Sequence, residues 1–200
     1  MRILYGVNLL VWAGLLSACL SQPKPADWLA VGFRTPEETF RTFQTGLRAD
    51  QPDLEYRCLS SRLKSEQVGS QLVYRTFRQE LFKTHPWIRY AAWAKVVESK
   101  ELSRSRRRLV ARIDTWFFDE TFAIDFERED YYELWSGGQL LWDDFHPWEG
   151  SVTLEKALQS PEAELVVRVP FEDGLEPADV TEIGAGSQWK ITAFPALDTL

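Results

Sequence analysis

The hydrophobic pattern of the chain changes its period once, near Trp87. Before that residue, apolar side chains recur every three or four positions, which predicts amphipathic helices. After it they tend to alternate, which predicts strands with one face in the core. Helical segments followed by strands favour an α+β fold over alternating α/β units. We therefore expect N-terminal helices packed on one face of a curved, mostly antiparallel sheet.

Three helices are predicted in the first part of the chain. Thr35 can cap the first helix, Glu38 completes a capping box, and the helix should end near Ala49. A short second helix follows within 50–59. The third should cover about 70–83. Its expected buried stripe has three residues four positions apart: Val73, Phe77 and Leu81.

Strands are predicted after Trp87, separated by turns wherever the alternation breaks. Arg128–Asp130 and Gly184–Ser187 are interpreted as two such turns, and Gly137-Gly138 as a third break. Residues 140–145 fit either a strand or a loop. The expected strands cover 94–101, 108–115, 121–127, 131–135, 164–171, 180–183 and 189–194, with a short helix at 151–158.

The N-terminus has the composition of an export signal. Arg2 provides a positive charge, and the apolar stretch after it is shorter than the roughly 20 residues that span a bilayer. It closes with Leu16-Ser17-Ala18-Cys19, which resembles the lipobox of bacterial lipoproteins. That resemblance implies that residues 1–18 are a signal peptide and that Cys19 is lipidated, with fatty acids such as palmitate. The alternative is an ordinary secretory signal that ends in a chance cysteine.

The lipobox resemblance also implies a location. It places an extracytoplasmic domain on a bacterial membrane, held there by the lipid on Cys19. Leu20, where an aspartate would favour the inner membrane, favours the outer membrane facing the periplasm. Residues 19–32 are then a spacer, extended over 21–28 because of its prolines, and residues 33–195 form a single α+β domain.

The charge of the chain limits its partners. The formal net charge is −7, and cleavage would remove only Arg2 among the charged side chains. An acidic domain has no general affinity for nucleic acid or anionic lipid, so the membrane contact should run through the anchor alone. The basic run Ser103–Arg107 could bind phosphate or an acidic partner, but a solvated hairpin end is the preferred interpretation.

Three short motifs are similar to those of the nuclear-transport-factor-2-like, or ketosteroid-isomerase-like, superfamily. They are Thr35–Phe40 in the first helix, the acidic turn and short helix of Asp50–Ser60, and Trp189-Lys190-Ile191-Thr192 in the last strand. The resemblance covers about 33–194. It implies a cone-shaped, cystatin-like sheet wrapped around a long helix, with a cavity at its open end. Members include isomerases, dehydratases, ligand binders and dimerisation modules, so the fold alone selects no function.

Enzymes on such a cone place an acid or base and a hydrogen-bond donor in an apolar pocket. Asp125 and Tyr132 are the candidates here, with Asp114, Tyr74 and Tyr131 behind them. If the apolar neighbours of Asp125 face the core, Asp125 faces solvent, and the opposite register would turn it into the cavity. The alternation leaves both registers open, so no residue is assigned a catalytic role.

The remaining residues of interest have a structural and a functional interpretation. Cys58 fits a small core residue better than a reactive thiol. His85 and His146 each precede a Pro-Trp pair, and turn residues are favoured over a metal site because no ligand motif accompanies them. The tryptophans that survive cleavage fit a core or cavity lining better than a surface that stacks on sugars: Trp28, Trp87, Trp93, Trp116, Trp135, Trp142, Trp148 and Trp189.

Taken together, these patterns favour a lipid-anchored envelope protein whose extracytoplasmic domain binds a protein partner or a small ligand without catalysis. The alternatives are a cavity enzyme of the isomerase or dehydratase type and a glycan-binding module. Homodimerisation is open by family analogy. No cofactor, metal ion or nucleic acid is expected.

Overall fold

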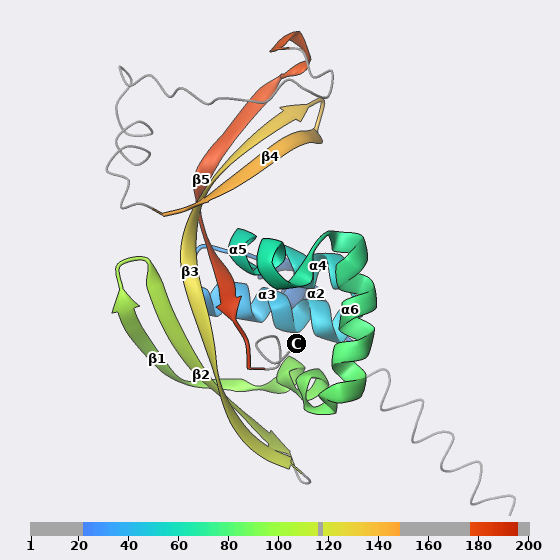
Figure 1. The fold of residues 1–200 in the computed structure, drawn as a ribbon, viewed down its shortest axis with the longest axis vertical. Coiled ribbons are helices and arrows are strands. Elements are labelled where there is room, and N and C mark those ends of the chain that lie inside the picture. The colour runs from blue at the N-terminus through green and yellow to red at the C-terminus, as the bar shows by residue number, and fades with distance from the viewer. Residues whose placement is uncertain (1–21, 116–117, 149–176, 196–200) are drawn as a thin grey trace, which may run out of the picture.

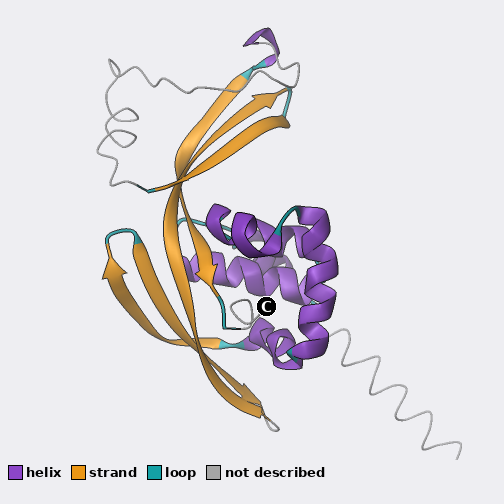
Figure 2. Ribbon diagram, in the orientation of Figure 1, coloured by secondary structure: helices purple, strands orange, loops and turns teal. Residues whose placement is uncertain are grey.

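A computed structural model describes residues 22–115, 118–148 and 177–195 of the chain. Helices come first and strands afterwards, and the helices gather on one side of a single curved sheet (Figures 1 and 2). The fold is therefore α+β, as the change of hydrophobic period predicted. Four predictions fall outside the described residues: the lipobox with Cys19, the place of Trp116, the helix at 151–158 and the strand at 164–171.

The predicted first helix has its Thr35 cap and its end at Ala49, but the predicted capping box with Glu38 is wrong. The helix runs over Pro36–Ala49, and the Glu38 backbone N–H donates to Thr35 Oγ1 at 3.1 Å. The Glu38 carboxylate accepts from the Arg34 backbone N–H and not from the cap residue. The helical segments are α2 (Pro25–Leu29), α3 (Pro36–Ala49), α4 (Pro52–Arg57), α5 (Ser61–Leu63), the π-helical turn η1 (Lys64–Val68), α6 (Gln71–Thr84) and the 3₁₀ helices η2 (Pro86–Trp93) and η4 (Pro177–Asp179).

Helix α6 occupies almost the predicted residues, and of the predicted buried stripe Leu81 is buried and Phe77 packs against the core, whereas the prediction for Val73 is wrong. Val73 is 52% exposed, whereas Tyr74 and Arg78 are buried. The cause is polar: Glu55 of α4 lies buried beside α6, and its carboxylate accepts hydrogen bonds from both Tyr74 and Arg78. A buried ion pair therefore sets the rotation of this helix, which a hydrophobic pattern does not report.

The expected extended spacer is also wrong in part, because Pro25–Leu29 form the short helix α2. Asp27 caps this helix by accepting from the Lys24 backbone N–H at 2.8 Å. Its carboxylate also lies 3.4 Å from Arg48 of α3. These contacts hold the segment against the domain, so it does not behave as a free tether.

The sheet has five strands in the described residues, and every pairing between them is antiparallel. Strand β3 is central: its first half pairs with β2, its second half pairs with β4, and β5 runs along its other edge. The strands are β1 (Lys95–Ser103), β2 (Arg106–Thr115), β3 (Phe118–Ser136), β4 (Gln139–Pro147) and β5 (Glu182–Ala193).

Strand β3 continues without interruption through Arg128–Asp130, so the predicted turn there is wrong. Both edges of the strand are paired at this point: Glu129 faces Pro147 on β4 and Gln188 on β5. We call the part beyond it the arm, formed by residues 129–147 and 182–188. The body is the group of helices from α2 to η2 together with the remaining strands. The arm extends past the helices (Figure 1).

Strand β5 is likewise continuous, and the predicted turn at Gly184–Ser187 is wrong. The glycines allow close packing instead of a turn. A Cβ atom on Gly186 would lie 2.8 Å from the Tyr131 ring, which covers that position from β3. Gly137-Gly138 do form the predicted break, with positive φ angles between β3 and β4.

The interior of the body, where a cone would be hollow, is filled with aromatic rings. Phe122 of β3 packs against Phe40 of α3 at 6.5 Å between ring centroids, and Phe194 lies 5.6 Å from Phe43. Trp87 stacks on Phe194 at 5.9 Å. Ring pairs of this kind add to the large apolar area that each aromatic residue buries. The space between α3 and the sheet is therefore core.

Candidate functional site

A hollow with converging polar groups lies where the arm meets the helices. It has a volume of about 550 Å³, and we call it the arm pocket. Residues of α4, η1, α6, β3, β4 and β5 contribute to it. Its lining consists of Tyr56, Arg57, Lys64, Ser70, Gln71, Glu133, Trp135, Leu140, Asp143, Phe145, Gln188 and Lys190.

Lys190 is the most deeply buried charged group of this pocket. The residue is 2% exposed, and its ammonium donates to the Arg57 carbonyl at 2.8 Å. No other hydrogen bond joins its Nζ to the described part of the chain. The Nζ lies 4.3 Å from the Phe33 ring centroid and 4.8 Å from that of Phe145. Burial, and next the nearby charge of Lys64, lower the pKa of Lys190 to about 7.

Lys64 stands beside Lys190 on η1. Its Nζ lies 4.6 Å from the Tyr56 ring centroid and 5.7 Å from that of Phe145, so one phenyl ring contacts both lysines. Burial lowers the pKa of Lys64, while the charges of Glu129 and Asp143 oppose that shift. Among the described residues, neither lysine has a carboxylate within ion-pair distance.

Glu129 lies below the pocket and is only partly satisfied. Its Oε1 accepts from the Ser61 backbone N–H at 2.8 Å and from the Ser61 hydroxyl at 2.7 Å. Its Oε2 is buried and has no hydrogen-bond partner among the described residues. A buried polar atom without a partner costs stability. Its presence beside two lysines without carboxylate partners indicates a ligand-binding site and not a structural core.

The opposite wall of the arm pocket belongs to the β3–β4 hairpin. Glu133 and Asp143 are direct register partners, so both carboxylates lie on the pocket face of the arm. Trp135 donates from Nε1 to Glu133 Oε2 at 3.3 Å. Like charges directly opposite across two strands are unfavourable. This wall therefore suits a cationic group.

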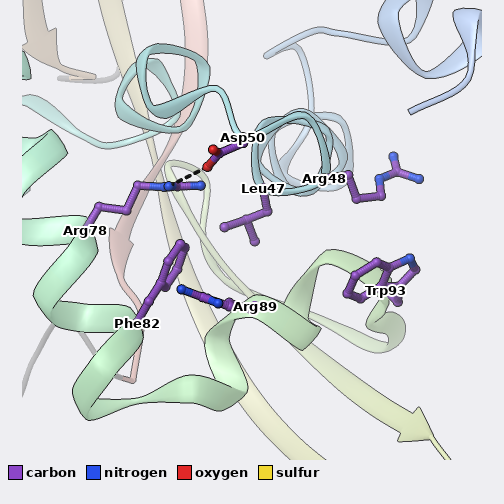
Figure 3. A pocket seen from close by; sticks show the side chains of 7 residues that line it. All are labelled: Leu47, Arg48, Asp50, Arg78, Phe82, Arg89 and Trp93. Carbon is purple, nitrogen blue, oxygen red and sulfur yellow. Dashed lines mark ion pairs between the residues drawn. The ribbon is translucent and has the colours of Figure 1, made fainter. Parts of the chain in front are cut away.

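A second hollow of about 360 Å³ lies between α3, α6 and η2 (Figure 3). Arg78 pairs with Asp50 there at 2.8 Å, and Arg89 lies over the Phe82 ring. The Arg48 side chain extends away from that pair. Asp27 pairs with Arg48, and Asp50 and Glu55 both pair with Arg78, so three carboxylates balance the charge of the three arginines in the described residues. The hollow therefore has no excess positive charge to attract an anion.

The two catalytic candidates do not meet. Asp125 lies on the outer face of β3, because its neighbours Ile124 and Phe126 are buried in the core. Its carboxylate pairs with Arg108 at 2.6 and 2.7 Å. Tyr132 alternates with Glu133 and so faces away from the arm pocket. Burial, and next the charge of Asp130, raise its pKa.

The other candidates also take structural positions. Tyr74 is committed to Glu55, and Tyr131 packs beside Phe145 on the arm. The basic run forms the solvated end of the β1–β2 hairpin, as preferred, with Arg107 3.4 Å from Glu101.

Cys58 is fully buried, and burial raises its pKa to about 12, which agrees with the core interpretation. His146 lies 2.7 Å from Asp144 on the arm, whereas His85 ends α6 in the body. No group of three or more His, Cys, Asp or Glu side chains in the described ranges could hold a metal ion. Trp28 and Trp93 are about half exposed on separate helices, while Trp87 belongs to the core packing.

Sequence reasoning missed Lys190 as a residue of the arm pocket, although it is a charged residue within an apolar, strand-like segment. Lys190 stands between Trp189 and Ile191 in a strand-like run, and it was predicted only as part of the last strand. Ile191 pairs with Phe126 in the core, and Lys190 pairs with Glu127. Both edges of β5 are paired at this point, because the chain at Cys58–Ser60 bonds to the Ile191 backbone on the side away from β3. The rings of Phe33 and Phe145 lie against the Lys190 ammonium.

Comparisons with known proteins give no match for this chain, whether with family models, curated proteins or solved structures. None of the helices in the described ranges is long and apolar enough to cross a membrane.

Proposed function

We propose that this chain is a lipid-anchored envelope protein whose extracytoplasmic domain binds a small ligand in the arm pocket, without catalysis. The observation that carries the proposal is a group of charges without partners at an aromatic-lined hollow. Among the described residues, buried Lys190 and half-buried Lys64 have no carboxylate within ion-pair distance, and a buried oxygen of Glu129 beside them has no hydrogen-bond partner. Ligand sites combine apolar walls with a few placed polar groups in this manner. A membrane-bound partner chain remains the second candidate occupant.

The filled body supports binding over catalysis. An isomerase-type site on this fold needs an acidic residue inside an apolar cavity. Here Phe40, Phe122 and Phe194 occupy that space, and Asp125 lies on the outer face. The order of helices and the bent sheet agree with the proposed nuclear-transport-factor-2-like resemblance, so the arm would be this chain's own addition to that frame.

The anchor is proposed from the lipobox alone. The full chain, expressed in a bacterium that processes lipoproteins, should yield a mature N-terminal peptide that starts at Cys19 and carries the mass of acyl chains. Cys19→Ser should remove that mass and release the protein from membranes. A mature chain with an unmodified Cys19 would overturn the anchor.

The binding proposal is tested on the lipidated full chain, purified gently in detergent and measured by native mass spectrometry. We expect an added small-molecule mass that Trp135→Ala weakens, because Trp135 lines the arm pocket. Trp93→Ala is the matched control, since Trp93 lies on η2 at the second hollow. Loss of the ligand with Trp93→Ala alone would move the site there. A bare mass that no added metabolite extract changes would sink the proposal.

A further inference from the structure

The arm pocket separates its charges onto two walls. Cationic side chains come from the helices and the last strand, namely Arg57, Lys64 and Lys190. Anionic side chains come from the β3–β4 hairpin, namely Glu133 and Asp143. A hollow with one positive and one negative wall is complementary to a molecule that carries both charges, and it disfavours a molecule with two charges of one sign.

The lysines of the positive wall have N–H groups that donate no hydrogen bond within the described residues. An ammonium group has three N–H donors, and Lys190 uses one of them on the Arg57 carbonyl. Lys64 contacts only ring faces of Tyr56 and Phe145 in the described structure. Two lysines that share the Phe145 ring repel each other, and an oxyanion placed between them would relieve that repulsion while accepting charge-assisted hydrogen bonds.

Other charged groups face Lys190 and shape its preference. Glu129 approaches from β3, but its Oε1 is held by Ser61. Glu127 pairs with Lys190 in register and feels the charges of Arg62 and Arg106. Cys58 and Arg57 approach from the α4 side. None of these groups forms an ion pair with Lys190 in the described residues, so the oxyanion would be its first direct counter-charge.

The negative wall has two neighbouring carboxylates that, in the described residues, lack a positive charge between them. Glu133 and Asp143 repel each other across the hairpin, and Asp143 also raises the pKa of the Tyr56 hydroxyl after the larger effect of burial. An ammonium group between the two carboxylates would relieve this repulsion. Trp135 and Leu140 on the same hairpin, and Tyr56 on α4, line the pocket and provide apolar area for the body of a ligand.

We infer that the ligand of the arm pocket is a small zwitterion, with its oxyanion directed to Lys64 and Lys190 and its ammonium group directed to Glu133 and Asp143. This inference rests on the proposed function and names its substrate class. A volume of about 550 Å³ lies within the range of small-molecule sites and suits an amino acid or a short peptide.

The test is a calorimetric titration of the full chain with three matched probes. L-phenylalanine carries both charges, N-acetyl-L-phenylalanine carries only the carboxylate, and L-phenylalaninamide carries only the ammonium. We expect the zwitterion to bind at least about tenfold more tightly than either derivative, since each derivative leaves one wall unsatisfied. Equal affinity for the three probes, or no binding of any, would overturn the inference.

Two variants assign each charge to its wall. In the double variant Glu133→Gln, Asp143→Asn, the zwitterion should lose its advantage over the N-acetyl compound and keep its advantage over the amide. In Lys190→Met, the advantage over the amide should shrink. Lys100→Met on exposed β1 is the matched control and should change neither ratio. Thermal melts confirm folding, and the partly exposed hairpin variant remains informative if the Lys190 variant fails to fold.

The outcomes separate this inference from the proposed function. If native mass spectrometry finds a neutral or doubly anionic compound that Trp135→Ala releases, the pocket binds a ligand and the zwitterion inference is wrong. If no compound is found and no probe binds, both are wrong.

Discussion

Two buried charged clusters in this domain contrast in how completely they are satisfied. In the body, both carboxylate oxygens of Glu55 accept hydrogen bonds from Arg78, one of them also from Tyr74. Arg78 then pairs with Asp50 as well. At the arm pocket, within the described ranges, Glu129 Oε2 has no hydrogen-bond partner and the Lys190 ammonium makes one hydrogen bond.

The contrast separates buried charges that are paired within the protein, and so stabilise the fold, from buried charges that lack a partner in the described residues. A buried charge is tolerated when it is paired and fully hydrogen-bonded. The Glu55 cluster meets that condition within the protein, even though burial raises the pKa of Glu55. The cluster at the arm pocket meets it only when a further group supplies charges. Neither hydrophobicity nor burial distinguishes the two, since all four central residues are buried.

Breaking the body cluster should give the largest effect. Arg78→Met leaves Glu55 buried without its cation, so we expect a loss of about 3–5 kcal/mol in the free energy of unfolding, measured by urea denaturation. Arg75→Met, one turn away, removes an exposed pair with Asp53 and should cost below about 1 kcal/mol. Equal costs for the two variants would show that the Glu55 cluster is not structural.

Removing the unpaired charge at the arm pocket should act in the opposite direction. The pKa of Lys190 is lowered from its ordinary 10.5 to about 7, so below pH 7 the folded protein carries a buried ammonium at a cost. At pH 6 we expect Lys190→Met to be more stable by roughly 1–3 kcal/mol, by analogy with apolar replacement of buried charges.

That gain should shrink as the pH rises from about 7 toward 10.5. In this window the unfolded wild-type chain binds the Lys190 proton and the folded one does not, so wild-type stability increases with pH. Thermal melts of the two proteins at pH 6 and pH 9 measure the difference. A Lys190→Met protein that is less stable at pH 6 would indicate an internal counter-ion.

Close packing around the body cluster gives a smaller effect. A Cβ atom on Gly46 of α3 would lie 2.8 Å from Glu55 Cγ and 3.1 Å from the Glu55 backbone nitrogen. Gly46→Ala should therefore lose about 1–3 kcal/mol through overpacking, against a gain of up to about 1 kcal/mol in helix propensity. Guanidinium denaturation should show a net loss, and a net gain would mean that α4 shifts freely.

An exposed ion pair outside both clusters should contribute least to the free energy of unfolding. Asp125 and Arg108 lie on the outer face of the sheet, with side chains 27% and 45% exposed. Asp125→Asn should change the free energy of unfolding by below about 1 kcal/mol and leave ligand binding unchanged. A loss of binding in this variant, measured in the same calorimeter, would revive the catalytic candidate on this strand.

Local signals predicted the elements whose ends are set locally. The capped start of α3 and its end at Ala49, the β1–β2 hairpin and the Gly137-Gly138 turn all follow from the residues within them. The continuity of β3 does not. Arg128–Asp130 has the composition of a turn, and only the partners on both edges keep it extended.

The arm pocket was harder to predict for the same reason. The polar signals of Lys190, Glu129 and Glu133 are ordinary for strand faces in water. They become unusual only in the folded domain, where Lys190 and Glu129 are buried and Glu133 lines the pocket. Burial of charge is a tertiary property, and a one-dimensional pattern contains only the charge.

Strand β5 carries Lys190, and it joins the sheet from the C-terminal side of the described chain. The β1–β2 and β3–β4 hairpins pair neighbouring segments, which form in microseconds, whereas Phe126 must find Ile191 across a long stretch of chain. The floor of the pocket is therefore completed by the slowest pairing in the sheet. A ligand could bind only after β5 has paired with β3 and the domain is folded. Ligand bound in the pocket would then indicate that the domain has completed folding.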